Sequence, residues 1–373
     1  MSQWRGAAFA GMFGGVNVTT RCLLLPLLVL ACGTNDDATT GESGEGDESS
    51  GGETGGDETA GAPTTGEPDG STGGESTGGE GEGWPDPEDA PSYEGEKFTG
   101  MQIYDVARDV WIDEPGLMTA LDPARLVFVG EKHEVAAIHE LELWVLNNML
   151  ERHDDVALGM EQFQRDEQPV IDSYLAGEID AATFEAESQP WDSYALYWKP
   201  LVEAMKAAGR PVRALNVPDE ALDGLYVEFP MSPLAVFNSW SEEAPYAAEL
   251  PPRPLAPWDA AYQGYFEASY DYEAHGKDWG LTYEEALDYF TDLALIRDDT
   301  MGWWIGRQLE DSADRMVVVA GDWHVQTGIA TPASAAKFTA AEQRRITTAT
   351  SASLAGVLAL ADVADYVLVY KPK

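Results

Sequence analysis

Two short apolar runs in this chain end in a glycine that is followed by an acidic residue and, two positions later, by a histidine. Residues 126–129 lead into Gly130-Glu131-Lys132-His133, and residues 316–320 lead into Gly321-Asp322-Trp323-His324. Each run is typical of a buried strand in a parallel sheet. Ligands of open parallel sheets bind at the carboxyl ends of strands, where loops carry polar groups. The two motifs therefore predict two halves of one site.

Further strand-like runs alternate with helical patterns along the chain. Strands are expected at 125–129, 156–160, 211–215, 316–320 and 366–370. Helices are expected at 136–152, 169–176, 181–186 and 201–208. In the first of these, apolar residues recur at spacings of three and four. The alternation predicts an α/β fold with a mostly parallel, doubly wound sheet flanked by helices.

The segment 218–304 breaks this alternation. It contains no clear strand, a proline-rich stretch and a cluster of aromatic residues that includes Tyr262, Tyr265 and Tyr270. We expect a helical, aromatic-rich cap inserted over the strand ends, with a long helix over 283–309. The tyrosines line either a flat ligand such as a porphyrin, whose iron tyrosine can ligate, or the core of the cap itself.

Polar residues follow each of the first four expected strands. They are Glu131 with His133, then Glu161, then Asn216, and finally Asp322 with His324. Glu131, His133, Glu161 and His324 are suited to hold a divalent metal through oxygen and nitrogen atoms. They are equally suited to supply a carboxylate base oriented by a histidine. Asp322 and Asn216 are also good helix-capping residues, and spacing alone leaves these alternatives open.

Two further residues are candidates for ligand contacts. His139 lies on the first helix, six residues after His133, and is either near the same strand end or partly exposed. Arg297 precedes Asp298 and Asp299 on the expected long helix, where three consecutive charges are typical of a solvated surface. Because basic residues are scarce, Arg297 is also a candidate clamp for an anion or carboxylate.

The N-terminal region is typical of an exported protein. Arg21 precedes ten mostly apolar residues that end at Cys32, a run too short to span a bilayer. Residues 1–32 are predicted to be a lipoprotein signal peptide with Cys32 as the lipidated residue, or else an ordinary cleaved signal. Residues 33–97 are acidic and rich in Gly, Ser and Thr, and we expect a disordered tether. The domain 98–373 would then sit at a bacterial membrane, in the periplasm or at the cell surface.

The charge balance restricts the partners. The chain has 22 basic and 66 acidic residues, of which 20 basic and 47 acidic residues follow residue 96. Binding to nucleic acid requires clustered Lys and Arg, so no nucleic-acid partner is expected. Both cysteines lie in the first 32 residues, so any metal in the folded part would use histidine and carboxylate ligands.

Taken in order, these motifs resemble the ChaN-like haem-binding family of iron-regulated lipoproteins, within the Tiki/TraB/erythromycin-esterase-like superfamily. Besides the two glycine motifs, the features that carry the resemblance are His139, 158–163, 168–169, 174–177, 191–192 with Tyr197, and 297–301. The resemblance covers roughly Phe98 to Lys373. It implies an α/β core with a helical cap, and it implies haem as cofactor and partner, in some members held as a cofacial pair across a homodimer.

The same resemblance implies roles for the candidate residues. Tyrosine is the axial haem ligand in the family, which makes Tyr262, Tyr265 and Tyr270 the candidates here, with His139 and Arg297 as further cofactor-binding residues. The expected function is a surface-tethered haem-binding lipoprotein for haem or iron uptake or handling, held at the membrane by its N-terminal lipid.

The wider superfamily implies an alternative function. It includes metal-dependent peptidases and ester-cleaving enzymes with paired Gly-x-x-His motifs. By position, their catalytic and metal-binding residues correspond to Glu131, His133, Glu161 and His324, with Mn, Co or Zn as the ion. The first helix departs from the usual ChaN pattern, because Glu142 stands where an amide is common.

Overall fold

The computed structural model of this protein describes residues 88–373, except residues 192, 228–229, 313 and 361 and the side chains of 274 and 275. The predicted signal peptide, Cys32 and the predicted tether as far as residue 87 lie outside the described residues. Residues 88–97, the last part of the predicted tether, are described, and Tyr93 forms an antiparallel bridge with Met101. Contacts with the sheet thus begin a few residues before Phe98.

The described strands form one sheet in the order β2-β1-β8-β7-β3-β6-β4-β5. Neighbours from β8 to β5 are parallel, and β1 and β2 extend the sheet as an antiparallel pair beside β8. The strands are β1 (Phe98–Asp105), β2 (Val110–Ile112), β3 (Leu126–Glu131), β4 (Val156–Gln164), β5 (Val212–Asn216), β6 (Arg315–Gly321), β7 (Gln343–Thr350) and β8 (Tyr366–Pro372). This is the mostly parallel α/β sheet predicted from the sequence.

Helices connect the strands and cover both faces of the sheet. Before the cap they are α3 (Glu114–Leu121), α4 (Ala136–Arg152), η1 (Arg165–Glu167), α5 (Gln168–Leu175), α6 (Ala181–Glu187), α7 (Tyr194–Tyr197) and α8 (Lys199–Ala208). The cap contains α9 (Asp219–Asp223), α10 (Pro233–Ser239), η2 (Ala247–Glu249), α11 (Ala260–Glu267), α12 (Tyr272–His275), η3 (Lys277–Trp279) and the start of α13 (Tyr283–Asp311). After β6 come α14 (Asp322–Val325), η4 (Gln326–Gly328), α15 (Thr331–Ala336) and α16 (Leu354–Leu358).

Alternate residues of the central strands enter two different cores. Val127 and Val129 of β3 pack with α3 to α8, whereas Leu126 and Phe128 pack with α13 and α15 on the opposite face. Side chains alternate across a strand, so a run that is apolar at every position requires cover on both faces. The central strands are therefore buried, and the polar residues Glu131 and Glu161 follow the apolar runs of β3 and β4.

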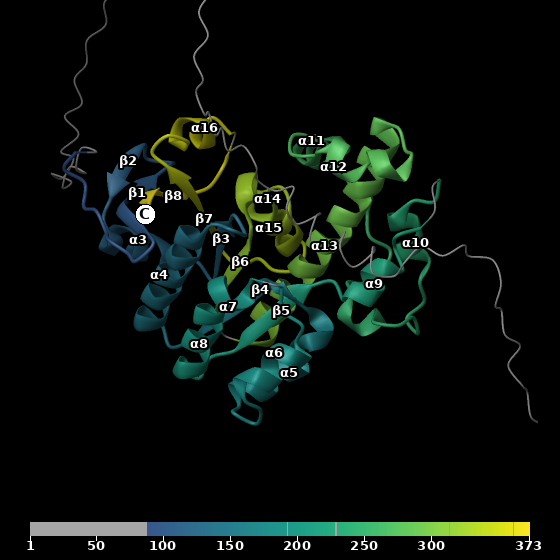
Figure 1. The fold of residues 1–373 in the computed structure, drawn as a ribbon, viewed down its shortest axis with the longest axis horizontal. Helices are drawn as coiled ribbons and strands as arrows, with labels where there is room; N and C mark the ends of the chain where they lie inside the picture. Colours follow the sequence, from purple (N-terminus) through teal and green to yellow (C-terminus); the bar gives the residue numbers. More distant parts are fainter. Residues whose placement is uncertain (1–87, 192, 228–229, 313, 361) are drawn as a thin grey trace, which may run out of the picture. The chain divides into compact units, whose positions relative to one another are not determined.

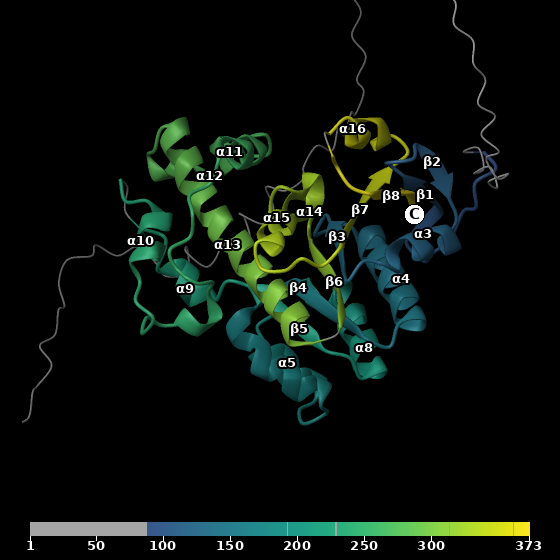
Figure 2. The ribbon, with the colours of Figure 1, turned by 180° about the vertical axis from the view of Figure 1, so that it is seen from behind.

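The cap has a core of its own. Apolar side chains of α9 to α11 pack on the first half of α13, and the second half of α13 packs on the sheet. Figures 1 and 2 show the cap helices gathered around α13, at the end of the domain opposite β1 and β2. A capping box of Thr282 and Glu285 starts α13. None of the helices in the described part of the chain has the length and apolarity needed to cross a membrane.

The predicted elements match most of the parallel strands, but one inner strand and the antiparallel pair were not predicted. The five predicted strands correspond to β3, β4, β5, β6 and β8, and the predicted helix over 136–152 is α4. The sequence analysis did not predict β1, β2 or β7. It also ended the long helix at 309, two residues before α13 ends.

Candidate functional site

The carboxyl ends of three adjacent parallel strands bring the two glycine motifs together. Glu131 at the end of β3 pairs in register with Gly321 at the end of β6, and β4 lies on the other side of β6. Glu161 of β4 accepts a hydrogen bond at Oε2 from the backbone N–H of Gly321, at 2.8 Å. The strand order alone therefore places Glu131, Glu161 and the second motif side by side.

Glu131 is fully buried and is held by several donors. Its Oε1 lies 2.6 Å from His133 Nδ1 and accepts a bond of 2.9 Å from the side chain of Gln162. Its Oε2 accepts a bond of 2.8 Å from the indole N–H of Trp198. Burial raises the pKa of Glu131, but the bonds from His133 and His139 outweigh it and hold the pKa well below its ordinary value. Glu131 is therefore a carboxylate anion.

His324 has an equivalent partner in Asp298 of α13. His324 Nδ1 lies 2.8 Å from Asp298 Oδ1, and Nε2 lies 3.4 Å from Glu161 Oε1. Asp298 also accepts bonds of 2.5 Å from the hydroxyls of Thr331 and Tyr262. Burial lowers the pKa of His324, but the nearby carboxylates of Glu161 and Asp298 raise it above its ordinary value.

The two histidines converge on Gly321 and Glu161. A Cβ built on Gly321 would lie 3.1 Å from His133 Nε2 and 3.6 Å from Glu161 Oε2. Each histidine thus has its Nδ1 bound to a carboxylate, and its remaining nitrogen lies toward the same strand end. The structure brings the four predicted residues Glu131, His133, Glu161 and His324 together at one end of the sheet.

Glycine is required at the start of the first motif by close packing. A Cβ on Gly130 would lie 2.3 Å from Asp322 Oδ1, an oxygen that accepts a bond of 2.8 Å from Thr347. Asp322 therefore bonds across to β7. Asn216 accepts a bond from the backbone N–H of Val217, the next residue. Among the described residues, neither Asp322 nor Asn216 forms a side-chain hydrogen bond with His133 or His324.

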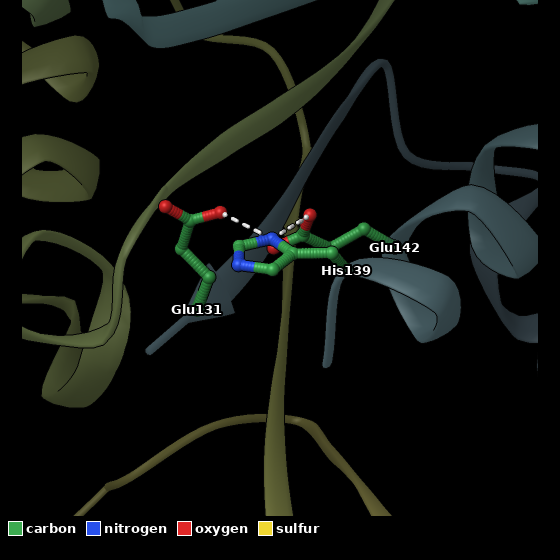
Figure 3. Close-up of side chains that lie close together, drawn as sticks. All are labelled: Glu131, His139 and Glu142. Carbon is green, nitrogen blue, oxygen red and sulfur yellow. Dashed lines mark hydrogen bonds and ion pairs between the residues drawn. The ribbon is translucent and has the colours of Figure 1, made fainter. Parts of the chain in front are cut away.

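His139 lies behind Glu131, on α4, and is buried (Figure 3). Its Nδ1 lies 3.1 Å from Glu142 Oε2 and 3.3 Å from Glu131 Oε2, and its Nε2 lies 2.8 Å from the backbone oxygen of His133. Its ring stacks on Tyr197 at 4.5 Å. Among the described residues, Glu131, His139 and Glu142 are the group that brings three ligand atoms within 4.8 Å of one another.

The charged triplet on α13 is buried, which corrects the expectation of a solvated cluster. Asp298 and Asp299 are almost fully buried, and Arg297 is 6% exposed. The cause is that α13 lies between the cap and the sheet, so that no side of it faces water there. Asp299 is neutralised by Lys337, but Arg297 has no ion pair or hydrogen bond among the described residues, and its buried Nε has no acceptor.

The three candidate tyrosines lie at different distances from the second motif. Tyr262 donates to Asp298, and Tyr265 stacks on the ring of Trp323 at 5.4 Å and donates to its backbone oxygen at 2.7 Å. Tyr270 instead packs on Phe266, and its buried hydroxyl has no partner among the described residues. Burial and the Asp298 carboxylate raise the pKa of Tyr262 well above its ordinary value, so Tyr262 keeps its proton.

The residues that hold Glu131 and His324 in place were not predicted from the sequence. Gln162 directly follows Glu161 on β4, where both sides of the strand are buried. A polar residue in such a strand needs a hydrogen-bond partner, which was a usable signal that Gln162 belongs to the site. Asp298 was visible only as part of a charge cluster. Trp198 and Thr331 come from α8's start and α15, and no local pattern pointed to them.

The fold and the site define an α/β domain whose histidine-acid groups lie at the carboxyl ends of the central strands, beneath a helical cap. The sequence matches the family model described as "Haem-binding uptake, Tiki superfamily, ChaN" over residues 117–334. That match spans more than half of the chain, so the protein belongs to this family.

One solved structure shows the same fold. The chain is similar to ChaN of Campylobacter jejuni, a structure described as showing cofacial haem binding, with 15% identity and a TM-score of 0.53 over 75% of this chain and 100% of that one. An erythromycin esterase mutant in its open conformation has 14% identity and a TM-score of 0.39, over 70% of this chain and 80% of that one. A Bacillus cereus protein has 12% identity and a TM-score of 0.37, over 64% and 68%. A search of curated proteins finds no match.

Proposed function

We propose that this protein is an exported, surface-tethered lipoprotein that binds haem between its cap and the strand ends, for haem or iron uptake or handling. Membership of a haem-binding family, with the match covering both motifs and the cap, is the observation that carries the proposal. Lipidation at Cys32, attachment to a bacterial membrane and a homodimer with haem at its interface are parts of the same proposal.

The buried guanidinium of Arg297 fits this ligand. A buried cation without a partner is costly, and a carboxylate is the group that a guanidinium binds best. Haem carries two propionates, and one of them would satisfy Arg297. Its charge also lowers the pKa of nearby Asp219, although burial has the larger effect and raises it. The side chains of the described residues thus leave an anion-binding group beside the second motif.

Tyr265 is the tyrosine best suited to ligate haem iron, because a tyrosine ligand must give up its proton. Tyr262 is bound to a carboxylate that opposes this loss, whereas Tyr265 donates to the uncharged backbone oxygen of Trp323. Haem, when bound, supplies the iron. Tyr265 and Trp323 supply a stacked aromatic surface next to His324, and Arg297 supplies positive charge.

We expect Tyr265→Phe to weaken haem binding at least tenfold, about 1.4 kcal/mol, because the iron loses its oxygen ligand. The measurement is a haemin titration of the purified protein, followed by the Soret band. Tyr270→Phe is the matched control, since its hydroxyl has no partner in the part of the chain that the structure describes, and its loss should leave the affinity unchanged. No saturable Soret shift in the unmodified protein would remove the haem proposal.

A metal-dependent hydrolase is the second candidate, favoured by one feature of the site. Each histidine has a carboxylate on Nδ1, the arrangement that orients metal-binding and acid-base histidines, and both lie close to Glu161. In this proposal His133, His324 and one of the two glutamates would hold a divalent ion, which would supply an activated water, and the other glutamate, Glu131 or Glu161, would act as general base.

We expect Glu161→Gln to lower any ester or peptide hydrolysis at least a hundredfold while leaving the Soret titration unchanged. The assay compares a panel of esters and peptides with Mn²⁺, Co²⁺ or Zn²⁺ and with chelator. The hydrolase proposal is rejected when the protein cleaves none of these substrates in a metal-dependent way.

A further inference from the structure

The group formed by Glu131, His139 and Glu142 brings three possible metal-ligand atoms close together. Figure 3 shows the His139 ring between the two carboxylates, with Nδ1 directed at both. Nδ1 lies 3.1 Å from Glu142 Oε2 and 3.3 Å from Glu131 Oε2. All three side chains are buried, so water does not separate these atoms.

The protonation of His139 follows from its other nitrogen. Nε2 lies 2.8 Å from the backbone oxygen of His133, and a carbonyl oxygen only accepts hydrogen bonds, so Nε2 carries a hydrogen. In the neutral ring Nδ1 then has a lone pair, and that lone pair faces two carboxylate oxygens. Three electron-rich atoms in a buried space repel one another unless a positive charge lies among them.

Glu142 provides a second, independent sign of a missing partner. Its Oε1 is buried and has no hydrogen-bond partner among the described residues. Burying a carboxylate oxygen without a hydrogen-bond donor costs roughly several kcal/mol of folding free energy, unless the carboxylate takes up a proton and becomes neutral. The Nδ1 of His139 already lies close to two other carboxylate oxygens and cannot also satisfy Oε1.

We propose that Glu131, His139 and Glu142 bind a divalent transition-metal ion through Oε2 of Glu131, Nδ1 of His139 and the carboxylate of Glu142. A mixed nitrogen and oxygen set of this kind suits Zn²⁺, Mn²⁺, Co²⁺ or Fe²⁺. Ligand atoms about 2.0–2.2 Å from such an ion are roughly 3.3 Å apart in tetrahedral geometry, close to the two separations observed. The proposal is independent of haem binding and of hydrolysis.

The surrounding residues act as outer partners of this site. The backbone oxygen of His133 fixes the ring of His139, and Trp198 donates to Glu131 Oε2, as groups behind metal ligands commonly do. A dication also balances the two carboxylate charges with a neutral histidine. Without the ion, a second proton on His139 provides the positive charge. Burial lowers the pKa of His139, but Glu142 and Glu131 raise it to about 11.

The site would link a metal to the first glycine motif. Glu131 binds the ion through one oxygen and His133 through the other. An ion at this position therefore fixes the carboxylate that orients His133, and it lies on the α4 side of Glu131, away from the second motif. It is a positioning site, separate from any ion held by His133, Glu161 and His324.

The test is metal binding by the full-length protein after removal of bound ions with a chelator. Co²⁺ is the first probe, because its visible absorption reports nitrogen and oxygen ligands, and elemental analysis after dialysis gives the amount bound. We expect one ion per chain, and we expect Glu142→Gln and His139→Ala to weaken binding at least tenfold. Glu142→Gln preserves the shape of the side chain, so a folded variant is available even when His139→Ala does not fold.

The control variants are His324→Ala and Glu161→Gln, which change the other histidine motif and should retain the Co²⁺ spectrum. Failure of the unmodified protein to bind Co²⁺, Zn²⁺ or Mn²⁺ overturns the proposal. Undiminished Co²⁺ binding by Glu142→Gln overturns it as well. Loss of Co²⁺ binding in all four variants also overturns it, because the ion would then belong to the strand-end histidines. Haem binding is measured separately, and its outcome does not affect the conclusion about the metal site.

Discussion

Replacing Gly302 with alanine is expected to lower the free energy of unfolding by about 3 kcal/mol, which is at the upper end of the usual range for overpacking a core. Gly302 lies in the buried half of α13, where α15 crosses it. An added Cβ would lie 2.5 Å from the backbone carbon of Ser334 and 2.6 Å from the backbone nitrogen of Ala335. Backbone atoms cannot rotate away as a side-chain tip can, so the two helices must separate.

The measurement is urea or thermal unfolding of the variant beside a matched alanine substitution. Gly264→Ala on α11 adds the same atom in open space, and alanine there should raise helix stability by up to about 1 kcal/mol. Opposite signs for the two variants are the expected result. Equal effects would show that α13 and α15 are not packed as closely as described. Because α15 carries Thr331, the Gly302 variant should also disturb Asp298.

Asp298→Ala is expected to cost roughly 3–5 kcal/mol, the range for breaking a buried ion pair by removing one partner. The substitution leaves the Nδ1 of His324 without its carboxylate and leaves the hydroxyls of Thr331 and Tyr262 without an acceptor. Each unsatisfied buried donor adds about 1–3 kcal/mol. The effects overlap, since all three donors share one carboxyl group.

The control for Asp298→Ala lies ten residues earlier on the same helix. Asp288 is exposed and accepts one bond from Gln263 at 2.6 Å, so Asp288→Ala should change stability by less than about 0.5 kcal/mol. Unfolding curves of both variants give the comparison, and haem titration of Asp298→Ala reports whether His324 is still in place. A loss for Asp298→Ala no larger than that for Asp288→Ala would contradict the described bonds.

The central sheet was predictable because β3, β4 and β6 each contain an uninterrupted apolar run. Strands buried on both faces, such as β3 and β6, have a pattern that only a covered parallel sheet explains. Strands β1, β2 and β7 were not predictable because they lack such a run. Strand β7 begins with Gln343 and two arginines, and β1 has an irregular register between Thr99 and Gln102, which interrupts the period of two.

The site was predictable to the extent that strand ends determine it. The motifs placed Glu131, His133, Glu161 and His324 at three neighbouring strand ends, and the structure puts them there. Asp298 belongs to a distant helix, and only tertiary packing turns a charged triplet into a buried partner of His324. The spacing of His139 and Glu142, three residues apart on α4, puts both on one face of a helix, a signal that the charge of Glu142 alone did not convey.

The register of β3 between β6 and β7 has a consequence for how a ligand enters. Residues 126–129 of β3 pair with both β6 and β7, and residues 316–319 of β6 pair with both β3 and β4, so exposing their backbone amides to solvent exchange requires the centre of the sheet to open. The motif residues are thus attached to the slowest-opening segment of the molecule. We therefore expect a ligand to enter through fluctuations of the cap, because helices α10 to α12 have no such strand neighbours.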